Sequence, residues 1–336
     1  MVNHPNFIGN SIDYMQFCKM ENEPNISSLS IKEARDRIDH MIHRTPVLHS
    51  EAINEMAGCE LFFKCENFQK VGAFKARGAA NAVLKMSDKD RANGVATHSS
   101  GNHAAALARA AKVANIPAYI VMPSNAPAVK KQAVEGYGGI VITCEPNLQA
   151  REEGLKQVVE KYGATFIPPY DHLDVIEGQA TCALEIFDAG FSLDFLLAPV
   201  GGGGLLAGTA LASAFYSPET KVIGAEPEGA DDARRSFIAG KIIPMGKPNT
   251  IADGLLTSLG KLNFEIISDK VHDILTVNDG EIIAAMRLIY ERMKIVIEPS
   301  CAVPLAVVLK NKDLFKKQKV GIILSGGNVD LSRLPF

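Results

Sequence analysis

The stretch GVATHSSGNHAAALARAAKVANIPAYIVM, residues 94–122, decides the fold class. A short apolar run over 95–97 is followed by an alanine-rich helical pattern over 102–114 and by a second apolar run over 119–122. A strand, a helix and a strand in this order are typical of a βαβ unit, in which the two strands lie parallel. The stretch therefore predicts an α/β protein whose sheet is covered by helices.

The same alternation continues along the chain. Further strand candidates, many of them rich in β-branched residues, lie at 140–143, 165–167, 195–198, 221–225, 274–277 and 320–324. Helical patterns occur between them, over 128–135, 148–162, 205–214 and 281–294. Two sets of such units predict two doubly wound domains with mostly parallel sheets. Ligands of such sheets bind beyond the carboxyl ends of the strands.

The first part of the chain is predicted to hold a tail, a helix and a short strand. Residues 1–27 are expected to form a disordered tail, because 1–25 are polar and aperiodic. Ser30 and Glu33 have the spacing of a capping box, and we expect the helix that they open to run to about Ile42. A strand is expected at 60–65.

Composition indicates an ordinary soluble globular protein in a reducing compartment. The 336 residues are 47% apolar and 22% charged, and the net charge of −3 gives no basis for binding nucleic acids or membranes. No apolar run has the length of a membrane span. The six cysteines form no C-x-x-C pair and no secretory signal precedes them, so free thiols and a cytoplasmic location are expected.

Gly201-Gly202-Gly203-Gly204 follows a strand candidate and precedes a helix candidate. Consecutive N–H groups without Cβ atoms can surround a phosphate, and the positive end of the helix dipole adds to the attraction. The loop lacks the Lys-Ser/Thr pair of a Walker loop and the spacing of the dinucleotide fingerprint. A tight strand-to-helix turn is the alternative, but four glycines carry a large entropic cost for a plain turn. We therefore predict a phosphate site.

Two further turns follow strand candidates and carry polar groups. Ser99-Ser100-Gly101-Asn102-His103 offers hydroxyls, an amide, an imidazole and N–H groups that suit a carboxylate. Helix capping by Ser100 or Asn102 would also explain it. Ser325-Gly326-Gly327-Asn328 offers one hydroxyl to a ligand, and a plain turn is the alternative. Taken alone, neither turn predicts a site.

Lys75 lies in Ala73-Phe74-Lys75-Ala76-Arg77-Gly78, between an aromatic residue and a run of small residues. A solvated surface charge is the simple interpretation. The glycine-rich and serine-rich turns, however, supply a phosphate site, a carboxylate site and a hydroxyl, which together suit an aldehyde cofactor bound to a lysine. We therefore hypothesise that Lys75 binds pyridoxal phosphate (PLP).

The stretch from Glu226 to Asp232 reads Glu-Pro-Glu-Gly-Ala-Asp-Asp and follows a strand candidate. It gathers hard oxygen ligands of the kind that Mg²⁺ or Ca²⁺ prefers. An acidic, solvated helix start, favoured by the helix dipole, accounts for the pattern equally well. The residues alone leave both interpretations open.

The chain resembles the fold-type II PLP enzymes, and within them the eukaryotic serine racemases and the serine/threonine dehydratases. The resemblance extends from about Ser30 to Leu331 and rests on motifs that come in the same order: 43–48, 63–69, 73–78, 99–103, 201–204, 251–254, 298–300 and 325–331. It implies the fold of the tryptophan synthase β-subunit, with PLP in a cleft between two domains. The expected domains are a large PLP-binding domain, 28–80 plus 172–336, and a small mobile domain, 81–171.

The resemblance also implies roles for single residues. Lys75 forms the imine with PLP and moves the α-proton of the substrate on one face. The remaining cofactor contacts are expected at Phe74, Asn102, Gly201, Gly202, Gly203, Gly204, Leu205, Gly254 and Ser325. The carboxylate of the substrate is expected at Ser99, Ser100, Asn102 and His103. A divalent cation, Mg²⁺ or else Ca²⁺ or Mn²⁺, is expected at Glu226, the carbonyl of Ala230, and Asp232.

Ser100 favours racemisation over dehydration alone. Racemisation by two bases needs a proton carrier on each face of the planar carbon, and Lys75 and Ser100 would supply them. Family members that only dehydrate commonly carry alanine at this place, although some hydroxyaspartate dehydratases share the Ser-Ser-Gly-Asn-His turn. Arg151 lies where it could meet a second carboxylate, which keeps a hydroxyaspartate or threonine/serine dehydratase as the alternative. We expect a homodimeric serine racemase that also eliminates serine to pyruvate and ammonia.

Overall fold

A computed structural model describes residues 26–126 and 128–336. The predicted tail over 1–27 lies outside the described residues except for its last two positions. One of these, Ser27, is the N-cap of the first helix, α1 (Ser28–Ile38), so the predicted tail extends too far at its carboxyl end. No helix in the described ranges is both long and apolar enough to cross a membrane.

The larger sheet has six strands in the order β1 (Val47–Leu48), β2 (Glu60–Cys65), β10 (Lys319–Leu324), β7 (Phe195–Pro199), β8 (Lys221–Pro227) and β9 (Asp273–Val277). Only the pairing of β1 with β2 is antiparallel. Successive residues of one strand enter opposite cores: Phe62 packs with one hydrophobic cluster and Phe63 with the other. The central strands are therefore buried on both faces, as a parallel sheet requires.

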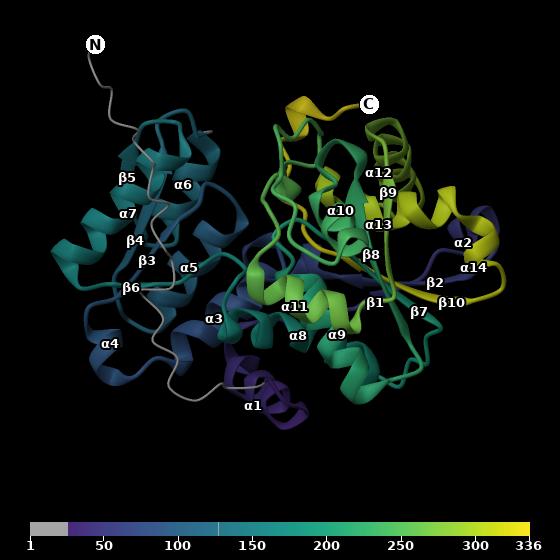
Figure 1. The fold of residues 1–336 in the computed structure, drawn as a ribbon, viewed down its shortest axis with the longest axis horizontal. Coiled ribbons are helices and arrows are strands. Elements are labelled where there is room, and N and C mark those ends of the chain that lie inside the picture. The colour runs from purple at the N-terminus through teal and green to yellow at the C-terminus, as the bar shows by residue number, and fades with distance from the viewer. Residues whose placement is uncertain (1–25, 127) are drawn as a thin grey trace, which may run out of the picture.

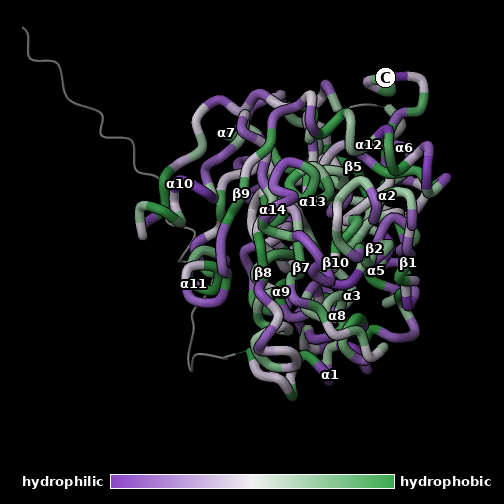
Figure 2. The backbone as a smooth tube through the Cα atoms, turned by 90° about the vertical axis from the view of Figure 1, so that its right-hand side faces the viewer, coloured by the Kyte–Doolittle hydropathy of each residue, from purple (hydrophilic) through white to green (hydrophobic). Residues whose placement is uncertain are grey.

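Helices from distant parts of the chain cover the two faces of this sheet. One face is covered by α1, α8 (Leu173–Asp188), α9 (Gly204–Tyr216) and α11 (Lys261–Lys270). The other face is covered by α2 (Glu51–Ala57), α12 (Asp279–Met293) and α13 (Pro299–Lys310). In Figure 2 the tube at α13 is largely hydrophobic green, in keeping with a helix that is buried almost all round. The remaining helices of this part are α10 (Asp232–Ala239) and α14 (Lys312–Phe315).

The smaller sheet has four parallel strands in the order β5 (Ile140–Cys144), β4 (Ala118–Pro123), β3 (Val95–His98) and β6 (Thr165–Phe166). Its helices are α4 (Asp88–Ala92), α5 (Asn102–Val113), α6 (Ala128–Gly136) and α7 (Leu148–Tyr162). Ile120 packs with the core beneath α5, and Val121 with the core beneath α7. Figure 1 shows this sheet in one lobe and β7 to β10 in the other, with α3 (Lys75–Lys85) and α8 between them.

The predicted fold class is confirmed, and each strand candidate coincides with a strand, although the candidate at 165–167 extends one residue beyond β6. The first helix starts earlier than predicted, because the Oγ of Ser27 accepts from the N–H of Ser30 and the Oγ of Ser30 accepts from the N–H of Ser27. Ser30 is thus the third helical residue and not the cap. The helix ends at Ile38, and a 3₁₀ turn over Asp39–Met41 takes the chain nearly to the predicted end. The cysteines in the described ranges are free thiols, as expected.

Candidate active site

Lys75 is the first residue of α3 and is held next to the end of β10. The backbone N–H of Phe74 donates to the carbonyl of Ser325 at 3.0 Å, and Ala73 forms a bridge with Gly326. The lysine stretch and the serine stretch, about 250 residues apart in the chain, are thereby neighbours. Ser325 is itself buried. This places both at the carboxyl end of a central parallel strand, where ligands of doubly wound sheets bind.

The ammonium group of Lys75 is poorly solvated. Its Nζ donates to the carbonyl of Pro169 at 2.6 Å and lies 5.0 Å from the ring centre of Phe74 and 5.9 Å from that of Tyr170. Burial lowers the pKa of Lys75 to about 8, against an opposing effect of the negative Glu298. An amine with such a pKa is uncharged often enough at neutral pH to attack an aldehyde.

The tetraglycine loop follows β7 and leads into α9. Gly203 caps this helix with a φ of 96° and has no side chain, so the cap residue offers no side-chain acceptor to the first N–H groups of α9. A Cβ on Gly202 would lie 2.3 Å from ring atoms of Tyr170, and one on Gly201 would lie 3.0 Å from the backbone of Leu255. The loop is thus shaped as a cradle of N–H groups at a helix start, which fits a phosphate. Leu205, in the first turn, is buried.

The Ser99–His103 turn joins β3 to α5 and reaches the larger sheet through Asn102. The amide Nδ2 of Asn102 donates to both carboxylate oxygens of Glu298, at 3.0 and 3.2 Å. Its Oδ1 accepts from Nδ2 of Asn328 at 2.9 Å. One amide hydrogen and one lone pair remain beyond these contacts. The structure therefore brings the predicted carboxylate turn and the last serine-glycine turn together around one asparagine.

His103 is buried and neutral. Burial, with a smaller contribution from Lys75, lowers its pKa to about 3. Nε2 lies 3.0 Å from the carbonyl of Ile167, which can only accept, so Nε2 carries the proton. Nδ1 is buried without a protein partner among the described residues. A contact from this nitrogen to a carboxylate would require its protonation, which the low pKa opposes.

Ser99 and Ser100 directly follow β3, and Arg151 acts on His98, the last residue of that strand. The Oγ of Ser99 accepts from the N–H of Gly101 at 3.4 Å, and Ser100 is partly exposed. Arg151, in α7, is close enough to His98 to lower the pKa of that imidazole, an effect second to burial. A guanidinium therefore lies near the serine turn, on the side of the smaller sheet.

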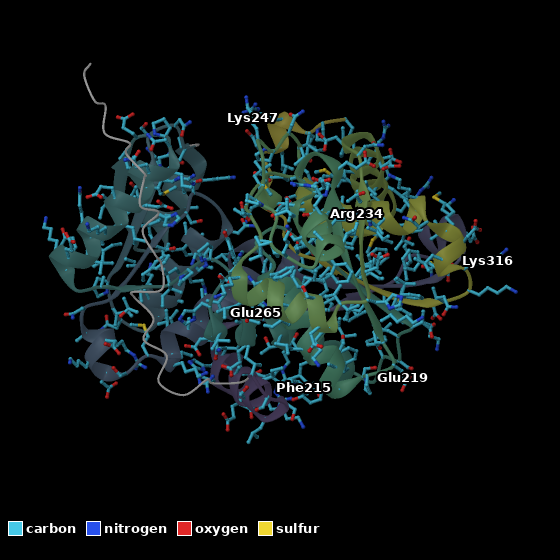
Figure 3. All side chains as sticks on the ribbon, in the orientation of Figure 1. Phe215, Glu219, Arg234, Lys247, Glu265 and Lys316 are labelled. Atoms are coloured by element: carbon cyan, nitrogen blue, oxygen red, sulfur yellow. The ribbon has the colours of Figure 1, made fainter. Side chains whose placement is uncertain are left out.

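The acidic stretch from Glu226, near the end of β8, to Asp232 contains a buried pair of carboxylates. The two carboxylate oxygens of Glu226 accept from the N–H groups of Ala233 and Arg234, at 2.9 and 2.8 Å, at the start of α10; Figure 3 labels Arg234. Asp232 accepts from the N–H of Leu259 at 2.9 Å, and its Oδ1 is buried without a partner in residues 26–126 and 128–336. Burial, reinforced by Asp232, raises the pKa of Glu226 to about 8.

A hard divalent cation fits this donor set. Ala230 is buried beside it, at the end of a 3₁₀ turn over Glu228–Ala230. No cluster of three or more His, Cys, Asp or Glu side chains suited to a metal occurs in the part of the chain that the structure describes. The candidate set has only two carboxylates, and a backbone carbonyl would have to be the third ligand.

Four groups in or near this site were not assigned roles from the sequence. They are the carbonyl of Pro169, the ring of Tyr170, the carboxylate of Glu298 and the amide of Asn328. The motif at 251–254 contacts the motif at 298–300. The N–H of Gly254 donates to Oγ of Ser300 at 2.9 Å, so this loop packs on the start of α13 beside Glu298. The only sequence signal for Glu298 was its place in the 298–300 motif.

Comparison with known proteins agrees with the fit of these residues to PLP. The model of a family described as pyridoxal-phosphate dependent enzyme matches residues 38–326. The chain belongs to this family. PLP is accordingly its cofactor, and the fold is that of the fold-type II PLP enzymes.

Similar members of the PLP-dependent family are named either as racemases or as dehydratases. The chain is 50% identical over 319 residues to a serine racemase from Dictyostelium discoideum, covering 94% of this chain and 98% of the relative. It is also 50% identical over 303 residues to a β-hydroxyaspartate dehydratase from Paracoccus denitrificans, with coverage of 90% and 96%. The structure of maize serine racemase, 46% identical, superposes with a TM-score of 0.88 over 90% of this chain and 94% of that one.

Proposed function

We propose that the protein is a PLP-dependent serine racemase that interconverts L- and D-serine and also eliminates serine to pyruvate and ammonia. The observation that carries the proposal is Ser100, a hydroxyl in the turn that Asn102 ties to the surroundings of Lys75. Racemases and dehydratases at up to 50% identity support the reaction class.

When bound, PLP supplies an electron-withdrawing ring that stabilises negative charge at the α-carbon of the amino acid. Lys75 Nζ removes or returns the α-proton on one face, and a pKa of about 8 lets it do both near neutral pH. Ser100 Oγ serves the opposite face. The tetraglycine loop and the start of α9 would hold the phosphate. The uncharged Ser325 would face the ring nitrogen without keeping it protonated, which would favour reprotonation or elimination over transamination.

The direct test is Ser100→Ala. Formation of D-serine from L-serine should fall by about 100-fold or more, as for loss of a proton carrier, whereas release of pyruvate from L-serine should persist. Ser99→Ala is the matched control, because it removes a neighbouring hydroxyl without removing the proposed proton carrier. It should raise KM and leave the ratio of the two products unchanged. D-serine formation at the parental rate in Ser100→Ala would overturn the assignment.

A hydroxyaspartate or threonine/serine dehydratase is the second candidate function. Arg151 favours it, because a guanidinium near the serine turn could bind the side-chain carboxylate of 3-hydroxyaspartate. Keto-acid release from serine, threonine and 3-hydroxyaspartate separates the two functions. If hydroxyaspartate is preferred, Arg151→Ala should abolish that preference and spare turnover of serine.

We further propose a divalent cation, Mg²⁺ or else Ca²⁺ or Mn²⁺, bound by Glu226, the Ala230 carbonyl and Asp232. EDTA should lower the melting temperature and Mg²⁺ should restore it. A melting temperature that responds to neither would remove the site from the proposal.

We also propose that the enzyme is a cytoplasmic homodimer with a small mobile domain over 81–171. That range contains all four strands of the smaller sheet, and its first boundary falls within α3.

A further inference from the structure

We propose that Glu298 is a positioning residue of the active site, which holds Asn102 across the two sheets and lies near the lysine stretch. The proposal rests on the proposed role of Lys75 as the lysine that binds PLP. Glu298 belongs to the larger unit, as the N-cap of α13. Asn102 belongs to the smaller unit, as the first residue of α5. Their contact is therefore a direct link between the two units inside the site.

The carboxylate of Glu298 is buried and fixed by its neighbours. Glu298 is 4% exposed, and its N–H donates to the carbonyl of Gly326 at 3.1 Å. A Cβ on Gly326 would lie 2.6 Å from Oε1 of Glu298, so only glycine at 326 admits the carboxylate. Asn328 completes the group: its Nδ2 donates to Oδ1 of Asn102 at 2.9 Å and to the carbonyl of Val71 at 2.7 Å. Asn102 is thus clamped at both ends of its amide.

The charges around Glu298 come from every element packed against it. Lys75 on α3 and Lys130 on α6 are the cations, and Asp253 in a 3₁₀ turn is the second anion. Lys130 also forms an ion pair with Asp253 at 3.1 Å. The buried thiol of Cys301 lies on the same helix as Glu298 and has its pKa raised, mainly by burial. Lys130 is thus the cation that lowers the pKa of Glu298, and Lys75 is the buried cation whose own pKa Glu298 raises.

Burial raises the pKa of Glu298 to about 7, whereas the hydrogen bond from Asn102 acts in the opposite direction. Above about pH 7 the carboxylate is ionised and favours the protonated form of Lys75. Below that pH the carboxyl group becomes neutral and no longer raises the pKa of Lys75. The two groups are coupled, so changing one should move the titration of the other.

The test compares Glu298→Gln with Glu298→Ala in the full chain freed of PLP. Addition of PLP is followed by absorbance near ~410–420 nm, where an imine of PLP absorbs, as a function of pH. Glu298→Gln keeps an acceptor for Asn102 but removes the charge, so the pH midpoint of PLP capture should fall below the parental value. A fall of about one pH unit would raise the capture rate at pH 7 about five-fold.

The contact with Asn102 is tested by the affinity for PLP. Glu298→Gln should bind PLP within about three-fold of the parent chain, whereas Glu298→Ala should lose about ten-fold, the effect of one buried hydrogen bond. Asp253→Asn is the matched control, because it removes a nearby negative charge that does not contact Asn102. It should leave both the midpoint and the affinity close to the parental values.

The outcomes separate this proposal from the proposed function. An unchanged midpoint in Glu298→Gln, or equal affinities for PLP in Glu298→Gln and Glu298→Ala, would overturn the role of Glu298. If Glu298→Ala does not fold, the midpoint in Glu298→Gln still decides. Neither readout uses an amino acid, so a failure to racemise serine would overturn the racemase proposal alone. A parent chain that forms no imine with PLP would overturn both.

Discussion

At the scale of single residues, Gly202 lies so close to the Tyr170 ring that no residue with a Cβ fits there. Its place in the loop is closed by the ring of Tyr170, which a Cβ would approach to 2.3 Å. Tyr170 also lies near Lys75, so the same ring borders the tetraglycine loop and the lysine. A displaced Tyr170 would therefore disturb two parts of the site at once. The requirement for glycine here is one of space, and at Gly203 it is one of backbone conformation.

Gly202→Ala should weaken PLP binding about ten-fold or more and destabilise the fold by about 1–3 kcal/mol, as overpacking does. Equilibrium dialysis with PLP and urea unfolding measure the two effects. Gly246→Ala is the control, because nothing lies within 4 Å of the added Cβ there. If the two variants bind PLP equally well, the loop is not shaped by Tyr170.

At the scale of elements, α3 is fixed by a buried cluster of charges behind Lys75. The guanidinium of Arg77 contacts Glu66 at 2.8 Å and Glu185 at 2.7 Å, and Lys64 contacts Glu185 at 2.6 Å. All four side chains are at most 7% exposed. Two positive and two negative charges make the cluster neutral overall. It joins β2, α3 and α8, so it holds the helix that carries Lys75 against two other elements.

Arg77→Met should cost about 3–5 kcal/mol, because it leaves buried carboxylates without their main partner. Arg77→Lys should recover only part of this, since an ammonium cannot contact both carboxylates with a planar fork. Urea unfolding measures the loss. Arg287→Ala is the control: its contact with Glu291 is exposed, and the expected change is below about 0.5 kcal/mol. A loss in Arg77→Met as small as that of the control would show that the cluster does not stabilise the fold.

The elements also show which parts of the fold and of the candidate site could be predicted from the sequence. Strands such as β7 and β10 are short apolar runs followed by glycine-rich turns, and both features are local. The tetraglycine loop and Ser325 could be singled out as candidates because each follows the carboxyl end of such a strand. The helix α8 was not predicted; residues 175–184 are all buried, and they include the polar side chains of Glu177 and Gln179. Glu298 had no assigned role, because its contact with Asn102 joins residues 196 positions apart.

At the scale of the whole molecule, one buried and two partly buried histidines make stability depend on pH. Burial is the main cause that lowers the pKa of His98, His103 and His172. In the unfolded chain each imidazole takes up a proton near pH ~6.5. The unfolded state therefore binds more protons than the folded state as the pH falls through that value, and the free energy of unfolding decreases. Glu226 and Glu298 act in the opposite sense, because their pKa values are raised in the folded state.

The contribution of His103 can be separated from those of the other groups. The change in unfolding free energy between two pH values is measured in the parent chain and in a His103 variant, and the two changes are compared. Between about pH 7.5 and about pH 5.5, a histidine that is neutral in the folded state should cost about 1 kcal/mol of stability. His103→Gln keeps a donor for the carbonyl of Ile167 and removes the titration, so its loss over this interval should be smaller by about that amount. Urea unfolding of both chains at both pH values measures it. The exposed His40, replaced by Gln, should leave the loss unchanged. If His103→Gln loses as much stability as the parent chain, then His103 is protonated in the folded protein, and its place beside Lys75 would have to be reconsidered.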